Sequence, residues 1–264
     1  MNFFTFLVAI FFSLQVHAAG PVCGPLVNPT TSSEDCPSSG LDAWTPPLEA
    51  QWTRDVDGQR SGIMNVYVHG DLDQLREALK SAGWIQSVDN NRKDDVQYLH
   101  AVFTYEHAIL TEKDKKLSAT YRKRLQSELN KAFTSVQSMP VSNEYYCGDL
   151  QTIAFEKNNN PLGGRHHLRI WVLGQKDNAG VPVLAVAASH DIGIVFDRSR
   201  PKQGFLNHKV ESDADLERDL VVIDLKKSGA VAAEKQWAIK FSCPAPRDGL
   251  TSADQRAVDL TLKN

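Results

Sequence analysis

Residues 165–173 read Arg-His-His-Leu-Arg-Ile-Trp-Val-Leu, and residues 181–189 read Val-Pro-Val-Leu-Ala-Val-Ala-Ala-Ser. The second run is almost entirely apolar, the first alternates apolar with polar residues from His167 to Ile170, and both are bounded by turn-forming residues, which is typical of strands. The pattern predicts three successive strands, at Tyr145–Glu156, His166–Leu173 and Val181–Ser189. Turns are expected between them at Asn158–Pro161 and Asp177–Gly180. Strands connected in this way form an antiparallel meander.

The flanking sequence predicts helices and further strands. Met64–Val68 has strand composition, and Asp71 and Gln74 have the spacing of a capping box that starts a helix. Leu72, Leu75 and Leu79 give this helix one apolar face, and Gly83 is expected to end it. The other predicted elements are strands at Leu99–Tyr105, Phe205–Val210, Trp237–Phe241 and Ala257–Leu262, a helix at Thr111–Met139, and a helix from Ser212 to Gly229 with Leu216, Leu220 and Ile223 facing inward. The expected fold class is α+β, a mostly antiparallel sheet with flanking helices.

The first residues predict export from the cytoplasm. A mostly apolar run from Phe3 is followed by Val16-His17-Ala18, so residues 1–18 are interpreted as a signal peptide. An uncleaved anchor stays open as the alternative, because no Lys or Arg precedes the apolar run. Residues 19–62 are rich in Pro and Ser and predict an extended arm, and residues 63–264 are expected to form the α+β domain. A periplasmic or secreted chain with no transmembrane segment after cleavage is expected, because no later apolar run is long enough to cross a bilayer.

The chain has four cysteines, an even number that favours disulfides in an exported protein. Three pairings are open. We favour Cys23 with Cys36 and Cys147 with Cys243. Metal binding by these cysteines is the weaker interpretation, because none of them stands in a Cys-x-x-Cys pair.

The charge balance argues against nucleic acid as a partner. The 29 Lys and Arg residues are matched by 32 Asp and Glu residues, for a formal net charge of −3. The predicted helix Thr111–Met139 gathers basic residues that could contact an anionic lipid or polymer, namely Lys113, Lys115, Lys116, Arg122, Lys123, Arg124 and Lys131. A solvated helix face is the simpler interpretation.

The central strand predicts a polar face. Alternation places His167, Arg169 and Trp171 on the face opposite Leu168 and Ile170, with His166 on the core side. A polar face of His, Arg and Trp on a central strand suggests a pocket. The alternative for His167 is a structural hydrogen-bonding histidine.

Asp191 and His208 are the other candidate catalytic residues, together with His167. Asp191 follows the apolar strand and His208 lies on the next one, so a carboxylate and an imidazole could act as an acid–base pair or bind a divalent metal. The candidate binding residues are Arg165, Arg169, Trp171, Asp215, Arg218 and Asp219. Arginine suits an anion such as phosphate, because the guanidinium fork matches its oxygens. The simpler alternatives are a turn role for Asp191, an ion pair for Asp215 with Arg218, an exposed position for His190, and helix capping for Asp213 and Glu217.

Several common signatures are absent from the sequence. There is no Gly-x-Ser-x-Gly, no phosphate-binding Gly-x-x-x-x-Gly-Lys, no His-Glu-x-x-His and no dinucleotide-binding fingerprint. The common hydrolase and cofactor classes therefore lose support.

The Arg165–Trp171 run, Asp191, His208 and the Asp215–Asp219 run, with the segment from Asn65, resemble the LssY C-terminal domain family over roughly residues 63–225. In that family the domain can be joined to membrane segments, including ones similar to lipid phosphatases. The family implies no established activity. The region between Ile85 and Leu150 departs from the family pattern.

Two functions remain open. In the first, the His, Arg and Asp residues form a site for an anionic ligand or substrate of the envelope, small or lipid-linked, with phosphorylated compounds among the candidates and a divalent metal left open. In the second, the same residues form a structural polar network inside a non-catalytic interaction module that binds an envelope protein or a membrane surface. Convergence around an open pocket favours the first, and mutual pairing in a buried position favours the second.

Overall fold

The computed structural model describes residue 30 and residues 44–87, 141–157, 164–196, 206–240 and 251–263. Their elements in chain order are β1 (Gln51–Asp55), β2 (Arg60–His69), α1 (Leu72–Ser81), β3 (Ile85–Gln86), β4 (Glu144–Tyr146), β5 (Asp149–Leu150), β6 (Ile153–Lys157), β7 (Arg165–Lys176), β8 (Pro182–Phe196), β9 (Leu206–Val210), α4 (Ala214–Lys227), β10 (Val231–Ala238) and β11 (Arg256–Leu262). The predicted signal peptide, most of the arm, the turn at Asn158–Pro161, the elements at Leu99–Tyr105 and Thr111–Met139, and Cys23, Cys36 and Cys243 lie outside the described residues. The disulfide pairing therefore stays a prediction.

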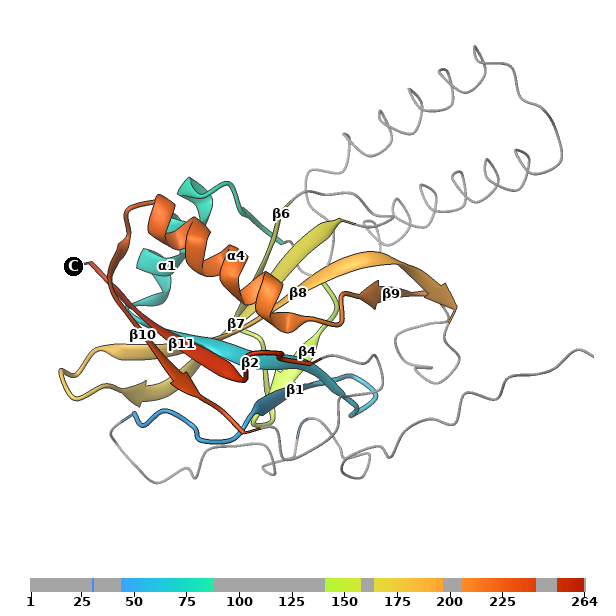
Figure 1. Ribbon diagram of the computed structural model, residues 1–264, viewed down its shortest axis with the longest axis horizontal. Coiled ribbons are helices and arrows are strands. Elements are labelled where there is room, and N and C mark those ends of the chain that lie inside the picture. The colour runs from blue at the N-terminus through green and yellow to red at the C-terminus, as the bar shows by residue number, and fades with distance from the viewer. Residues whose placement is uncertain are drawn as a thin grey trace, which may run out of the picture.

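The strands form one curled, mostly antiparallel sheet in the order β3-β6-β7-β8-β2-β1-β4-β5 (Figure 1). The sheet branches at two long strands, β8 and β2, each of which pairs with three other strands. β8 pairs with β7 and β2 and continues to pair with β9, and β2 pairs antiparallel with β1 and parallel with β11. With two helices in the described part of the chain, this arrangement agrees with the predicted α+β class.

Helix α1 forms as its local sequence predicts. The Asp71 side chain accepts a hydrogen bond from the Gln74 N–H at 2.8 Å, and the Gln74 side chain accepts one from the Asp71 N–H at 3.2 Å. Leu75, Ala78 and Leu79 are the buried residues of the helix. Gly83 follows it with φ +86°, a conformation that favours glycine.

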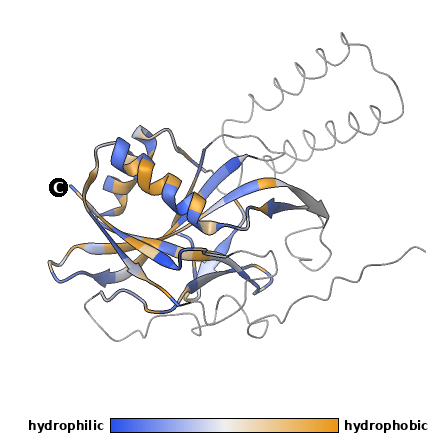
Figure 2. Cartoon of the chain, viewed as in Figure 1, coloured by the Kyte–Doolittle hydropathy of each residue, from blue (hydrophilic) through white to orange (hydrophobic). Residues whose placement is uncertain are grey.

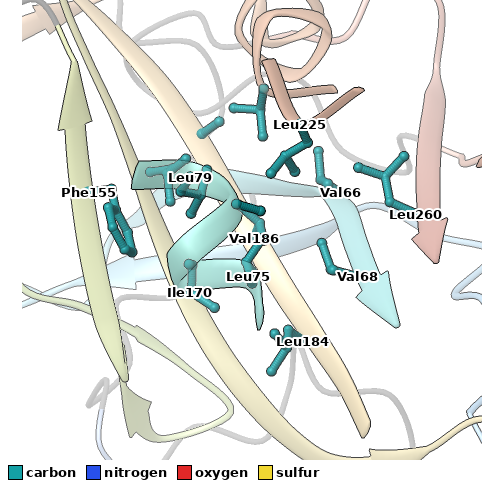
Figure 3. Packing of buried hydrophobic residues seen from close by; sticks show 14 of the residues in the cluster. Val66, Val68, Leu75, Leu79, Phe155, Ile170, Leu184, Val186, Leu225 and Leu260 are labelled. Atoms are coloured by element: carbon teal, nitrogen blue, oxygen red, sulfur yellow. The ribbon is translucent and has the colours of Figure 1, made fainter. Parts of the chain in front are cut away.

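The main core lies between the sheet and the two helices (Figures 1 and 3). Leu75 and Leu79 of α1 and Leu225 of α4 pack against Ile170, Val186 and other residues of the central strands (Figure 3). On a strand, neighbouring side chains point to opposite faces. The strand residues that alternate with these core residues therefore point to the other face of the sheet. There they contribute to a second core, which contains Tyr67, Trp171 and Trp44.

Two predicted strands have different limits in the structure. The single strand expected at Tyr145–Glu156 is interrupted, because Cys147 (φ 55°) and Gly148 (φ 82°) form a tight turn between β4 and β5, and β6 follows. The strand expected to end at Ser189 continues to Phe196, with a register shift between Asp191 and Gly193. β8 pairs with β7 as far as Asp191 and with β9 from Asp191 onward.

The sheet begins and ends differently from the predicted boundaries. β1 and the start of β2 lie within the segment assigned to the extended arm, so the sheet starts at Gln51. Of the late strand expected at Trp237–Phe241, Trp237 and Ala238 are the last residues of β10, which starts at Val231 and pairs with β11.

The predicted inward face of α4 is wrong. Leu216 is 61% exposed and Ile223 is 46% exposed, and Leu220 is only half-buried. Hydrophilic and hydrophobic residues follow one another along this helix (Figure 2). The helix buries Val221, Val222 and Leu225 together with charged residues whose partners offset their burial. Asp224, for example, accepts hydrogen bonds from Trp84 Nε1 at 3.0 Å and from Lys157 Nζ at 2.7 Å.

Within the described residues, neither helix is long and apolar enough to cross a membrane.

Candidate functional site

Asp191 is the centre of a buried polar network on the second-core face of the sheet. Asp191 is 1% exposed. It stands opposite Arg165 where β7 pairs with β8, next to the register shift in the pairing of β8 with β9. Arg165 donates from Nε at 3.1 Å, and its Nη2 lies 3.0 Å from the same carboxylate oxygen. His167 Nε2 donates to the other oxygen at 2.9 Å. Both carboxylate oxygens are therefore engaged.

His208 approaches the same carboxylate from β9. Its Nδ1 lies 3.5 Å from Asp191 Oδ2, and its side chain is 23% exposed, which makes it the most exposed of the groups on this carboxylate. Burial, only partly offset by Asp191, lowers the pKa of His208 to about 4. The imidazole is therefore neutral at physiological pH and does not supply a positive charge for an anionic ligand.

Arg169 extends the network toward β4. Its Nη1 lies 3.0 Å from Glu144 Oε1, and it donates to the Ser142 carbonyl at 3.0 Å and to Ser142 Oγ at 2.8 Å. Glu144 also accepts hydrogen bonds from the hydroxyls of Thr53 and Ser61, so its carboxylate is held by β1 and β2 as well. The network thus connects six strands of the sheet, β1, β2, β4, β7, β8 and β9.

The pKa shifts follow from this pairing. Burial alone would raise the pKa of the Asp191 carboxyl, but His167, His208 and Arg165 outweigh burial and hold it well below its usual range. Burial lowers the pKa of His167, and the contact with Asp191 offsets only part of that effect. His167 is therefore a neutral imidazole that donates to Asp191 through Nε2.

Ser189, His167 and Asp191 have the composition of a Ser-His-Asp triad, but not its geometry. Ser189 Oγ lies 3.0 Å from His167 Nδ1 and 3.3 Å from Nε2. A hydroxyl aligned with the in-plane lone pair of one ring nitrogen lies about 5 Å from the other. The nearly equal distances place Oγ over the ring face, so the ring is not positioned to accept the serine proton as a general base.

Trp171 shares the face of His167 and Arg169, as alternation predicts, but lies in the second hydrophobic core. Its Nε1 donates to the Asp149 carbonyl at 3.0 Å, and its ring packs edge-on against Tyr146 at 6.2 Å. Its indole therefore anchors β5 to the sheet.

Arg218 and its neighbours form a separate cluster between α4 and the segment before β11. Arg218 Nη1 donates to Asp215 at 3.1 Å, and its Nη2 donates to Asp219 at 2.7 Å and to Asp254 at 2.8 Å. Arg218 also donates to the Arg256 carbonyl at 2.9 Å. These contacts tie the C-terminal segment to α4. Asp215, Arg218 and Asp219 thus come together with one another, but not with Asp191.

A third polar group was not predicted as a site, and it occupies the helix-covered face of the sheet. His166 on β7 and His190 on β8 are register partners, and their rings stack at 4.3 Å. Glu217 of α4 accepts a hydrogen bond from His166 Nδ1 at 2.8 Å. One potential ligand atom from each of the three residues lies within 4.8 Å of the others, an arrangement that could hold a metal ion. His190, expected to be exposed, is partly buried.

Comparison with known proteins gives a family and no individual relative. The family model described as LssY C-terminus matches residues 118–252, slightly more than half of the chain. The match includes β4 to β10 with α4, and therefore all three polar groups except Thr53, Ser61, Asp254 and Arg256. No curated protein and no solved structure matches this chain.

Proposed function

The chain belongs to the LssY C-terminal family, and we propose that it acts as a non-catalytic interaction module of the cell envelope, with its sheet organised by the buried network around Asp191. The proposal rests on one observation: the arginines that were predicted to bind an anion are already paired with carboxylates of the chain. Arg165, Arg169 and Arg218 each have a carboxylate partner within 3.1 Å. An anionic ligand would have to compete with these carboxylates.

Burial points in the same direction. Arg165, His167, Arg169 and Asp191 are between 1% and 4% exposed. A substrate could not reach these groups without opening the sheet, and buried groups that satisfy one another are typical of a structural network. The partly exposed His208 is the one member of the Asp191 group that favours a ligand site, but it is held neutral.

The outer face of α4 supplies a surface for a partner. Leu216, Leu220 and Ile223 follow one another at i, i+4 and i+7 and therefore form one stripe along the helix. Leu216 and Ile223 are exposed in spite of their apolar side chains. Neighbouring exposed apolar side chains on a helix are typical of a protein contact rather than of an isolated surface residue. The partner expected is therefore a protein of the envelope, where the N-terminal apolar segment would direct the chain.

A paired experiment tests this proposal in the full chain. A photo-crosslinking residue at Leu216 should yield a discrete adduct with an envelope protein in cells, and a crosslinker at the exposed Ala232 of β10 should not. Adding Ile223→Asp should abolish the Leu216 adduct. Identical adducts from both positions, or none from Leu216, would refute the interaction surface.

Catalysis is tested separately with the purified chain. The wild type should hydrolyse phosphate monoesters and diesters no faster than the buffer does, with or without divalent metal. Turnover by the wild type that disappears in a folded His208→Gln variant would contradict the non-catalytic proposal and restore the anion hypothesis.

A further inference from the structure

We propose that His166, His190 and Glu217 form a binding site for a divalent first-row cation of the Zn²⁺ type, on the face of the sheet opposite the Asp191 network. This site goes beyond the proposed interaction module and does not depend on it. The three residues come from β7, β8 and α4, so the cation would join the helix to the two central strands.

The two faces of β7 separate two neighbouring histidines. His167 points toward Asp191, whereas His166 points toward α4, where it meets Glu217. His190 stands next to Asp191 on β8 and alternates in the same way, so it lies beside His166. Arg165, Asp191 and His208 belong to the opposite face and do not contribute ligands here.

The pairing among these three residues is incomplete. Glu217 is 3% exposed, yet its Oε1 has no hydrogen-bond partner among the described residues. The Nε2 atom of His190 is also buried without a partner in that part of the chain. Helix capping accounts for a negative charge near the start of α4, but not for a buried carboxylate oxygen and an imidazole nitrogen that are both left unpaired. A cation would satisfy both atoms.

The types of the ligand residues and the spacing of their ligand atoms indicate the class of cation. Two imidazoles and one carboxylate suit Zn²⁺ and its first-row neighbours, whereas Mg²⁺ and Ca²⁺ prefer oxygen ligands. Bonds of about 2.1 Å in tetrahedral geometry place ligand atoms about 3.4 Å apart. The ligand atoms lie within 4.8 Å of one another, so small side-chain rotations that also unstack the imidazoles would close the site.

Three protein ligands would leave one position of a tetrahedral cation for water. Leu168 and Ala188, each two residues from a proposed ligand, are part of the hydrophobic core beside the site. His166 is 18% exposed at its side chain, so the cluster is reached from the solvent side. Three protein ligands with one open position is an arrangement that zinc proteins use where the metal must also hold water or another ligand.

Titration of the purified chain with Zn²⁺ and Co²⁺ tests the site. The protein is prepared without a histidine tag and stripped of metal with a chelator. Calorimetry should show one Zn²⁺ per chain, and Co²⁺ should give the visible absorption of a four-coordinate site. His190→Asn and Glu217→Gln should each weaken Zn²⁺ binding at least about tenfold. His208→Gln removes a histidine from the opposite face and should leave the affinity unchanged.

The metal-free variants are first compared by circular dichroism and thermal unfolding. Glu217 is buried and its replacement can affect folding, so His190→Asn, at a partly buried position, decides the question if Glu217→Gln unfolds. The proposal is overturned if the wild type binds no stoichiometric Zn²⁺. It is equally overturned if folded His190→Asn binds Zn²⁺ as tightly as the wild type, since His166 and Glu217 would then form an ordinary ion pair.

Discussion

Replacing Asp191 with asparagine should destabilise the chain far more than the same replacement at Asp219. Both residues pair with an arginine, but the Asp191 side chain is 2% exposed and the Asp219 side chain is 58% exposed. Removing one member of a buried pair leaves the other charge uncompensated, which costs about 3–5 kcal/mol. Arg165 retains Glu156, whose nearest oxygen is 3.8 Å away, so a loss of about 3 kcal/mol is expected.

The control should lose less than about 1 kcal/mol, because exposed ion pairs contribute little. Arg218 also keeps Asp215 and Asp254 when Asp219 is replaced. Urea unfolding at pH 7, followed by the fluorescence of the 5 tryptophans, measures both free energies of unfolding. Equal losses in Asp191→Asn and Asp219→Asn would refute the structural role of the network. A more stable Asp191→Asn would indicate a carboxylate kept for function at the expense of stability.

Three further measurements follow from individual contacts. Burial lowers the pKa of His208 to about 4, so between that pH and about 6.5 the His208 imidazole is protonated in the unfolded chain but not in the folded chain. The stability of the fold should therefore rise with pH across this window. His208→Gln should flatten that rise, as measured by thermal unfolding. A hydrogen bond with Asp259 raises the pKa of His69, so the contribution of His69 to stability is complete below about pH 6.5 and is lost as pH rises through the folded-state pKa. His69→Gln should remove that loss of stability above about pH 6.5. A Cβ at Gly70 would lie 2.8 Å from a buried leucine methyl, so Gly70→Ala should cost about 1–3 kcal/mol, whereas Gly193→Ala, with nothing within 4 Å, should cost nothing in the same urea assay.

The opposite pH slopes at two histidines provide an internal check on the electrostatics. His208 is neutral in the folded chain because burial outweighs one carboxylate, whereas His69 lies between Asp177 and Asp259. Replacing the two histidines should change the slope of stability against pH in opposite directions, and changes of the same sign would contradict this assignment of causes.

The sequence by itself determined the elements whose signals are local. The capping box at Asp71, the apolar positions of α1 and the strand alternation around Leu168 depend on residues within one or two turns or pleats of each other, and all three appear in the structure. Family membership was also readable from the sequence, through the runs at Arg165–Trp171 and Asp215–Asp219.

The buried face of α4 could not be read from its hydrophobic pattern. Leu216 and Ile223 face outward because Glu217, Arg218 and Asp224 face inward toward charged or hydrogen-bonding partners on other segments. Such partners are far away in the sequence, and pairing offsets the cost of burying a charge. Hydropathy alone therefore selected the wrong side of the helix.

The composition of the two polar sites was decided by strand register, which only the tertiary structure contains. Lys176 pairs with Pro182, and a register shift then brings His166 opposite His190 and Arg165 opposite Asp191. Without that irregularity, the same hairpin would set His166 opposite Ile192. The irregularity places two extra residues on β7 relative to β8, and the packing of both faces of the sheet determines where it forms. The residue types were visible in the sequence, but this irregularity determined which of them meet.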